Sequence, residues 1–263
     1  MKLSRIASLF TILGALIVGL IIIPVITIFF RQFAFDFNGF LNSLTSVSIL
    51  SAVGRSCFAA FLAVIITLVF GVPLAYLLAR KDFRGKNLIE GIIDLPMAIP
   101  HVVAGIALLT VFGVNGLIGG PVSSLIKFEG ALPGIVVAMT FVSAPFLINS
   151  AREGFKSVNP HLEKVARSLG ASEWVAFRKV TLPLAFPHIL SGAVMSWARA
   201  ISEFAAVIML VGYFPMIAPG LIWSKFYSSG LEEGMSIAIV LLIITLTVLT
   251  ILKYVRRNYV DQY

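Results

Sequence analysis

Charge and cysteine are both scarce in this 263-residue sequence. Asp, Glu, Lys and Arg make up 12% of the residues and hydrophobic residues 59%, whereas soluble domains carry about 25% charged residues. The mean hydropathy is +1.02. With so few charged residues, the chain could not keep its apolar side chains away from water in a soluble fold. The composition therefore excludes a soluble domain and predicts an all-α bundle in a bilayer. The single cysteine, Cys57, excludes a disulfide framework, and we interpret it as an inert thiol in an apolar run.

Motifs for ATP binding, metal binding and nucleophilic catalysis are also missing. A P-loop needs Gly, four residues and then Gly-Lys-Ser/Thr. The only Gly-Lys pair, Gly85-Lys86, precedes Asn87 and has Arg80 at the position of the first Gly. Without ligand spacing around the histidines or a nucleophile elbow, we expect no metal, no cofactor and no catalytic residue. The chain is therefore not expected to be an enzyme, and any pumping must draw its energy from another protein.

Charge-free stretches long enough to cross a bilayer predict six helices in a single membrane domain over residues 1–263. Their predicted ranges are 6–30, 56–79, about 88–112, 130–151, about 188–211 and 234–252. The first is interpreted as a retained helix, because its 25 uncharged residues exceed the h-region of a signal peptide. Pro24 is expected to kink its far end.

Lys and Arg are unevenly distributed between the two sides of this arrangement. Four lie on one side: Arg31, Arg55, Lys127 and Lys225. Fifteen lie on the other side: Lys2, Arg5, Arg80, Lys81, Arg84, Lys86, Arg152, Lys156, Lys164, Arg167, Arg178, Lys179, Lys253, Arg256 and Arg257. The positive-inside rule places this second side, with both termini, in the cytoplasm of a cell-membrane protein. The net charge of +8 thus indicates membrane orientation and not nucleic-acid binding.

The long connection between the fourth and fifth helices, residues 152–187, has a helical pattern. Its apolar stripe consists of Leu162, Val165, Ala166 and Leu169. Gly170 is a natural stop, Ser172 can cap a second short helix through Phe177, and Pro183 is expected to end that tract. Three interpretations stay open: a hairpin that covers the helix bases, a lever that a soluble partner grips, or a basic amphipathic helix on the lipid surface.

Charged and helix-breaking residues within the predicted helices need a physical reason. Arg199 and Glu203 are four apart and share a helix face, so they either lock the fifth helix in place or give a pore a positive group. Pro96 and Pro100 interrupt the third helix, which predicts either a cavity lined by a half-helix N-terminus or a packing kink. His101, beside this break, is interpreted as a hydrogen-bonded packing residue.

The third and fifth helices are the predicted pore lining. Glu90 and Asp94, near the start of the third helix, are interpreted as acids that face the positive end of the helix dipole and not as a proton relay. The candidate pore or gate residues are Pro96, Met97, Ile99, Pro100, His101 and Ser202.

The long connection resembles the cytoplasmic motif of permease subunits of binding-protein-dependent ABC importers. That motif runs Glu-Ala-Ala, three residues, Gly, nine residues and Ile-x-Leu-Pro. With Gly170 aligned, residues 180–183 (Val-Thr-Leu-Pro) fall on its end, whereas the triplet reads Lys-Val-Ala at 164–166 and a glutamate stands one residue early. The resemblance implies an ATPase-docking loop that contains Glu163, Ala166, Gly170, Ala171, Ser172, Leu182 and Pro183.

Residues 94–101, 104–108, 196–204 and 213–219 are similar to the oxyanion branch of this family, which imports molybdate, tungstate or sulfate. The resemblance covers about residues 60–225 and is closest to molybdate/tungstate permeases. It implies a homodimeric pore in membrane lipid, two cytoplasmic ATPases and an external oxyanion-binding protein. The alternatives are a sulfate or thiosulfate permease and an ion-coupled secondary carrier, but a carrier often shows inverted repeats and several deep acids.

Overall fold

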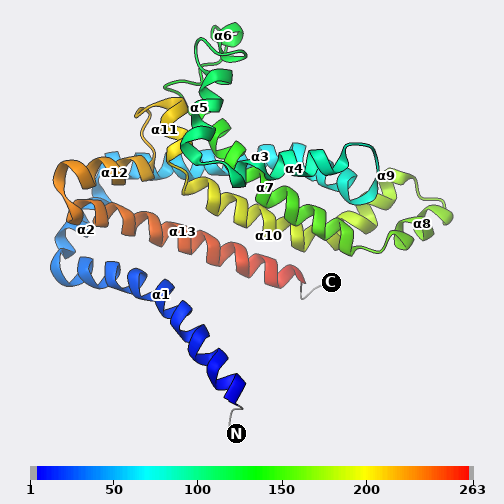
Figure 1. Cartoon of the computed structure of the whole chain (residues 1–263), viewed down its shortest axis with the longest axis horizontal. Helices are drawn as coiled ribbons and strands as arrows, with labels where there is room; N and C mark the ends of the chain where they lie inside the picture. Colours follow the sequence, from blue (N-terminus) through cyan, green and yellow to red (C-terminus); the bar gives the residue numbers. More distant parts are fainter. Residues whose placement is uncertain (1–4, 261–263) are drawn as a thin grey trace.

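The computed structural model describes residues 5–260, with side chains from 6 to 254, and all regular structure in that part of the chain is helical (Figure 1). Five helical stretches are long and apolar enough to cross a membrane. Their long helices are α1 (Arg5–Phe35), α3 (Val47–Arg80), α7 (Leu132–Ser157), α10 (Leu182–Ile201) and α13 (Leu231–Val260). The fourth stretch, Glu173–Ile201, consists of α10 and the two shorter helices that lead into it. A sixth crossing exists if α4 (Lys86–Ala98) and α5 (His101–Phe112) form one bent span. The predicted all-α membrane bundle is confirmed.

The centre of the bundle is α7, which packs against both α3 and α10. Small residues line these contacts, among them Ala59, Ala63 and Ala138, all fully buried. A Cβ added to Gly192 of α10 would lie 2.7 Å from the Ser150 Cβ of α7, so the two backbones approach each other closely. Close approach over small residues is how helices associate in lipid, where burying apolar side chains gives no driving force.

Helix α1 lies at the edge of the bundle, and its N-terminal half diverges from the other helices (Figure 1). Within residues 5–260 its main contacts are with α13 and the short helix α2 (Phe37–Thr45), and no residue of its apolar window is buried. Asp36 caps α2 by accepting a hydrogen bond of 3.0 Å from the Gly39 N–H. Some of the basic residues on the predicted cytoplasmic side lie outside the described part of the chain: all of Lys2, and the side chains of Arg5, Arg256 and Arg257.

Shorter helices occupy the two ends and one side of the bundle (Figure 1). One end carries α8 (Pro160–Ser168), α9 (Glu173–Ala176) and the π-helix η1 (Phe177–Thr181), and the opposite end carries α2 and α12 (Ala218–Ser229). Helices α5, α6 (Gly119–Val122) and α11 (Ala205–Val211) project from one side. Because α7 runs to Ser157 and α10 starts at Leu182, residues 158–181 connect the two long helices; we call them the α8–α9 segment.

Candidate functional site

The third predicted helix is broken into α4 and α5, whose axes differ by 115°. The break lies at Ile99, which is extended (φ −86°, ψ 144°) because it precedes Pro100. Pro96, by contrast, stays inside α4 and is buried, and Ile99 packs against the main core. Of the predicted gate residues in α4, Met97 is exposed. Only one of the two prolines therefore ends the helix.

The fifth predicted helix is also broken. Helix α10 ends at Ile201, and the chain resumes as α11 at Ala205. Arg199 lies in the last turn of α10, and Glu203 accepts a hydrogen bond of 2.8 Å from the Ala206 N–H at the start of α11. A cation at a helix C-terminus and an anion at a helix N-terminus are each favoured by the helix dipole. The two charges thus stabilise the two helix ends that the break creates.

The two breaks meet in a three-residue cluster of Arg199, His101 and Glu203. The Arg199 Nη2 lies 2.6 Å from the Glu203 Oε2 and 2.8 Å from the His101 Nε2. The His101 Nδ1 is 3.4 Å from the same carboxylate oxygen. Ser202 joins the cluster through its Oγ, which lies 3.3 Å from the Arg199 Nη1. The arrangement brings together the predicted charge pair and two of the predicted gate residues.

Contact between α5 and α11 holds this cluster in place. A Cβ added to Gly105 of α5 would lie 2.5 Å from the Met209 Cβ and 2.9 Å from the Ala206 Cα, so the two short helices need glycine here. Beyond α11, the following loop is anchored on α3, because Arg55 donates to the Met216 carbonyl and the Ala218 N–H donates to the Ser56 Oγ at 2.8 Å. The projecting pair is thus tied to the bundle at both ends.

Glu90 and Asp94 have side-chain partners on α7. Glu90 forms an ion pair of 3.2 Å with Arg152, and the Asp94 Oδ1 accepts a hydrogen bond of 2.6 Å from the Asn149 Nδ2. Neither acid lies in the first turn of α4, which begins at Lys86. The dipole interpretation is therefore wrong for these residues, and they fasten α4 to α7 instead.

The α8–α9 segment has the predicted helix–Gly–helix form. Asn159 caps α8, and Gly170 has a φ of +93°, a left-handed conformation that costs other residues about 1–2 kcal/mol. The Ser172 Oγ accepts a hydrogen bond of 3.3 Å from the Val175 N–H and so caps α9 as predicted. Pro183, however, does not end the helical tract, and this expectation was wrong. The wider π-helix η1 carries the chain into α10, where the Leu182 N–H donates to the Phe177 carbonyl and Pro183 lies in the first turn.

Glu163 connects this segment to the long helix α3. Its carboxylate forms an ion pair of 3.2 Å with Arg80 and accepts a hydrogen bond of 3.3 Å from the Tyr76 hydroxyl. The hydroxyl of Thr181 in η1 donates to the Glu163 Oε1, the same carboxylate oxygen that pairs with Arg80. The Arg80 Nη1 also donates to the Val158 carbonyl at 2.9 Å. A single carboxylate thus joins α3, α8 and η1.

An aromatic cluster of Trp174, Phe177, Tyr76 and Phe155 reinforces this connection. The ring of Trp174 lies 5.6 Å from Phe177, which lies 4.8 Å from Tyr76, and Tyr76 in turn lies 5.3 Å from Phe155 of α7. Sequence reasoning missed Arg80 and Tyr76, although their spacing of four puts them on one helix face at the end of a predicted span. That spacing is the signal that could have found them.

The outer face of the α8–α9 segment is exposed and partly apolar. Leu169 and Trp174 are 84% and 66% exposed. A shallow hollow between α8 and α9 is lined by Lys164, Arg167, Ser168, Ala171, Ser172 and Glu173. Of the residues expected to dock an ATPase, Ala171 and Ser172 line this hollow and Gly170 is exposed beside it, whereas Ala166 is half-buried. Leu182 and Pro183 are half-buried at the base of α10, and Glu163 points toward α3.

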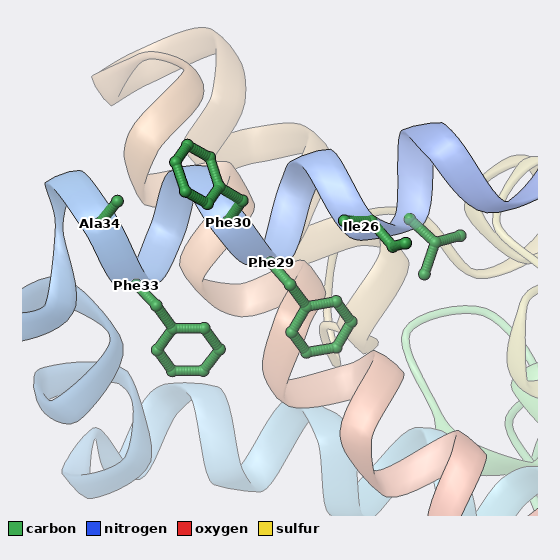
Figure 2. Close-up of a pocket in the computed structure, with 6 residues that line it drawn as sticks. Ile26, Phe29, Phe30, Phe33 and Ala34 are labelled. Atoms are coloured by element: carbon green, nitrogen blue, oxygen red, sulfur yellow. The ribbon is translucent and has the colours of Figure 1, made fainter.

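A second hollow, on α1, has a different character (Figure 2). It is lined by Val25, Ile26, Phe29, Phe30, Phe33 and Ala34. Figure 2 shows Phe29 and Phe33 pointing from one side of α1 and Phe30 from the other. These side chains offer no polar group, so this hollow suits lipid or another apolar surface and cannot hold an anion.

The family profile described as "Binding-protein-dependent transport system inner membrane component" matches residues 71–258. The chain belongs to this family. The chain is 43% identical over 252 residues, covering 95% of it and 96% of the relative, to the molybdate/tungstate transport system permease protein WtpB of Thermococcus kodakarensis. A probable sulfate transport system permease protein of Nephroselmis olivacea is 31% identical and covers 90% of the chain and 85% of that relative.

Solved ABC transporters have the same fold as this permease. A chain of the bacterial alginate ABC transporter in complex with its alginate pentasaccharide-bound periplasmic protein superposes with a TM-score of 0.76 at 19% identity, covering 94% of this chain and 93% of that one. An amino acid ABC transporter gives a TM-score of 0.58 and covers 80% of this chain and 94% of its own. The resemblance to importer permeases that the sequence indicated is confirmed.

Proposed function

We propose that this permease moves a tetrahedral oxyanion, molybdate or tungstate, through the membrane as part of an ABC importer. The observation that carries the proposal is the identity of 42–43% to molybdate/tungstate permeases of Thermococcus kodakarensis, Pyrococcus abyssi and Pyrococcus furiosus, over 94–95% of the chain. An alignment that covers 94–95% of the chain leaves too few residues outside it to omit the pore region or the α8–α9 segment, so the likeness concerns the whole permease.

The α8–α9 segment is the proposed docking site for an ATPase. Its exposed face offers apolar and basic side chains with a hollow between them, while Glu163 and the aromatic cluster fasten its inner face to α3 and α7. Movement of the segment would therefore be passed to α3 and α7 and would not be lost in a flexible loop. The permease itself hydrolyses no ATP in this proposal. The segment and both termini are proposed to lie in the cytoplasm of a plasma-membrane protein, and the positive-inside bias supports this orientation.

The pore is proposed to form between two copies of the permease, with an external oxyanion-binding protein delivering the anion. The proposed pore contacts are Arg199, His101 and Ser202, beside the two helix breaks. Broken helices at membrane depth are tolerated where they line a cavity or are buried in protein. Since α5 and α11 project from one side of the bundle (Figure 1), a second copy packed on this side would enclose them. Alternating access would then move this pair relative to α7 and α10.

Reconstitution into proteoliposomes tests the function. The permease, its cognate ATPase and its binding protein should import radiolabelled molybdate only with ATP inside, and uptake should survive a protonophore. Uptake driven by a pH jump without ATP would overturn the ABC mechanism.

Sulfate is the second candidate substrate, because sulfate permeases are about 31% identical over 90% of the chain. The same vesicles distinguish the two: excess unlabelled tungstate should abolish molybdate uptake, and equal sulfate should leave most of it. Strong competition by sulfate alone would favour the second candidate.

A further inference from the structure

The cluster at the two helix breaks is layered. The Glu203 side chain is 2% exposed, that of Arg199 22% and that of His101 41%. Ser202 is exposed beside them. The carboxylate therefore lies innermost, and the groups that can donate hydrogen bonds lie on the outer, accessible side.

The hydrogen bonds of the cluster follow the same order. Both carboxylate oxygens of Glu203 are occupied, one by the Ala206 N–H at 2.8 Å and the other by the Arg199 Nη2 at 2.6 Å. The Arg199 Nη1 makes a longer bond of 3.3 Å to the Ser202 Oγ. This outer face of the guanidinium could exchange Ser202 for an oxygen of a tetrahedral anion without breaking the contact to Glu203.

The charges of Arg199 and Glu203 cancel, so the cluster offers donors with little net positive charge. An unpaired arginine at membrane depth would attract a dianion strongly, since the local dielectric constant is low. Conduction requires sites that an ion enters and also leaves. A buried carboxylate directly behind the guanidinium lowers the attraction without blocking the approach.

We propose that Arg199, Ser202 and His101 form a weak transit site for a tetrahedral oxyanion, and that Glu203 is the counter-ion that keeps this site weak. The inference rests on the proposed function and adds a role for the buried acid: removing its charge should trap the anion. A purely structural pair, by contrast, would only lose stability.

Glu203→Gln tests the inference, because glutamine keeps the shape and an oxygen for the Ala206 N–H while it removes the charge. The permease–ATPase complex in nanodiscs, without nucleotide, is titrated with radiolabelled molybdate. We expect the variant to bind roughly tenfold more tightly than the wild type or better, and to import molybdate more slowly because release is delayed. The Arg199→Gln/Glu203→Gln double variant should lose the gain.

Glu90→Gln is the matched control, since it removes the acid of another Arg–Glu pair, that with Arg152 at 3.2 Å between α4 and α7. Its molybdate affinity should equal that of the wild type. If Glu203→Gln does not fold, His101→Lys adds a positive charge on the exposed side of the cluster and should also tighten binding.

The outcomes separate the two proposals. If the wild-type complex imports molybdate but neither Glu203→Gln nor His101→Lys binds it more tightly, the transit site is refuted and the proposed function stands. Equal tightening in Glu90→Gln would also refute it, because the effect would then come from net charge alone. If the wild-type complex imports no oxyanion, the proposed function fails and the transit site with it.

Discussion

Replacing Glu163 by alanine should destabilise the permease far more than an ordinary surface substitution. The change removes the partner of Arg80, whose side chain is only 8% exposed, and two hydroxyl contacts, to Tyr76 and Thr181. Breaking a buried ion pair by removing one partner costs about 3–5 kcal/mol, because it leaves a charge buried and uncompensated. Since the Glu163 side chain is itself 17% exposed, we expect the lower end, about 3 kcal/mol.

Glu153→Ala is the matched control. Glu153 pairs with Lys156 at 3.2 Å near the same end of the bundle, but its side chain is 58% exposed. Exposed pairs contribute about 0–1 kcal/mol. The free energy of unfolding is measured by titrating the protein in mixed micelles with SDS. Tryptophan fluorescence follows the transition, because Trp174 lies in the aromatic cluster next to the network.

A double-mutant cycle completes the test. Adding Arg80→Met to Glu163→Ala removes the unpaired cation, so the double variant should recover about 2 kcal/mol relative to the sum of the single changes. Two results would contradict this reasoning: Glu163→Ala lowers the free energy of unfolding no more than Glu153→Ala does, or the effects of Glu163→Ala and Arg80→Met on that free energy simply add. In either case the carboxylate does not hold the α8–α9 segment to α3.

Two further substitutions test the docking tip and the helix pair. Gly170→Trp should leave membrane insertion intact but abolish co-purification of the ATPase, because Gly170 is exposed and left-handed at φ +93°. The control is Gly54→Trp in α3, which also has open space around its Cβ position and should keep the complex. Normal complex formation by Gly170→Trp would remove the docking assignment. Gly105→Leu should reduce molybdate uptake by roughly tenfold, because overpacking against Met209 costs about 1–3 kcal/mol. Gly91→Leu in the open part of α4 should not reduce uptake, and equal uptake by both variants would show that the contact between α5 and α11 does not matter for transport.

Local features of the sequence were sufficient for most of the secondary structure. Spans were found because each needs about 20 apolar residues, a property of a continuous stretch. The stop at Gly170 and the cap at Ser172 were found for the same reason, since both act on backbone groups within a few residues. The end points were less accurate: α3 begins at Val47 and α10 at Leu182, because capping and packing outweigh hydropathy at helix ends.

The places where helices break were only half predictable. Proline marked the candidates, yet Pro100 ends α4 and Pro96 does not, and Pro183 is accommodated by a π-helix turn. Every proline lacks a backbone N–H and so cannot donate a helical hydrogen bond. Whether the helix ends there depends on what the neighbouring helices can pack against.

The sequence by itself determined the membrane class, the spans, the glycine that ends α8, and the presence of Arg199 and Glu203 within a predicted span. Only the tertiary structure decided their partners: Tyr76 meets Glu163 across 87 positions, and His101 meets Arg199 across 98. Hydropathy and capping act over one or two helical turns, whereas these contacts depend on how α3, α5, α7 and α10 pack side by side. That packing turns a charge pair four residues apart into a cluster that joins two broken helices.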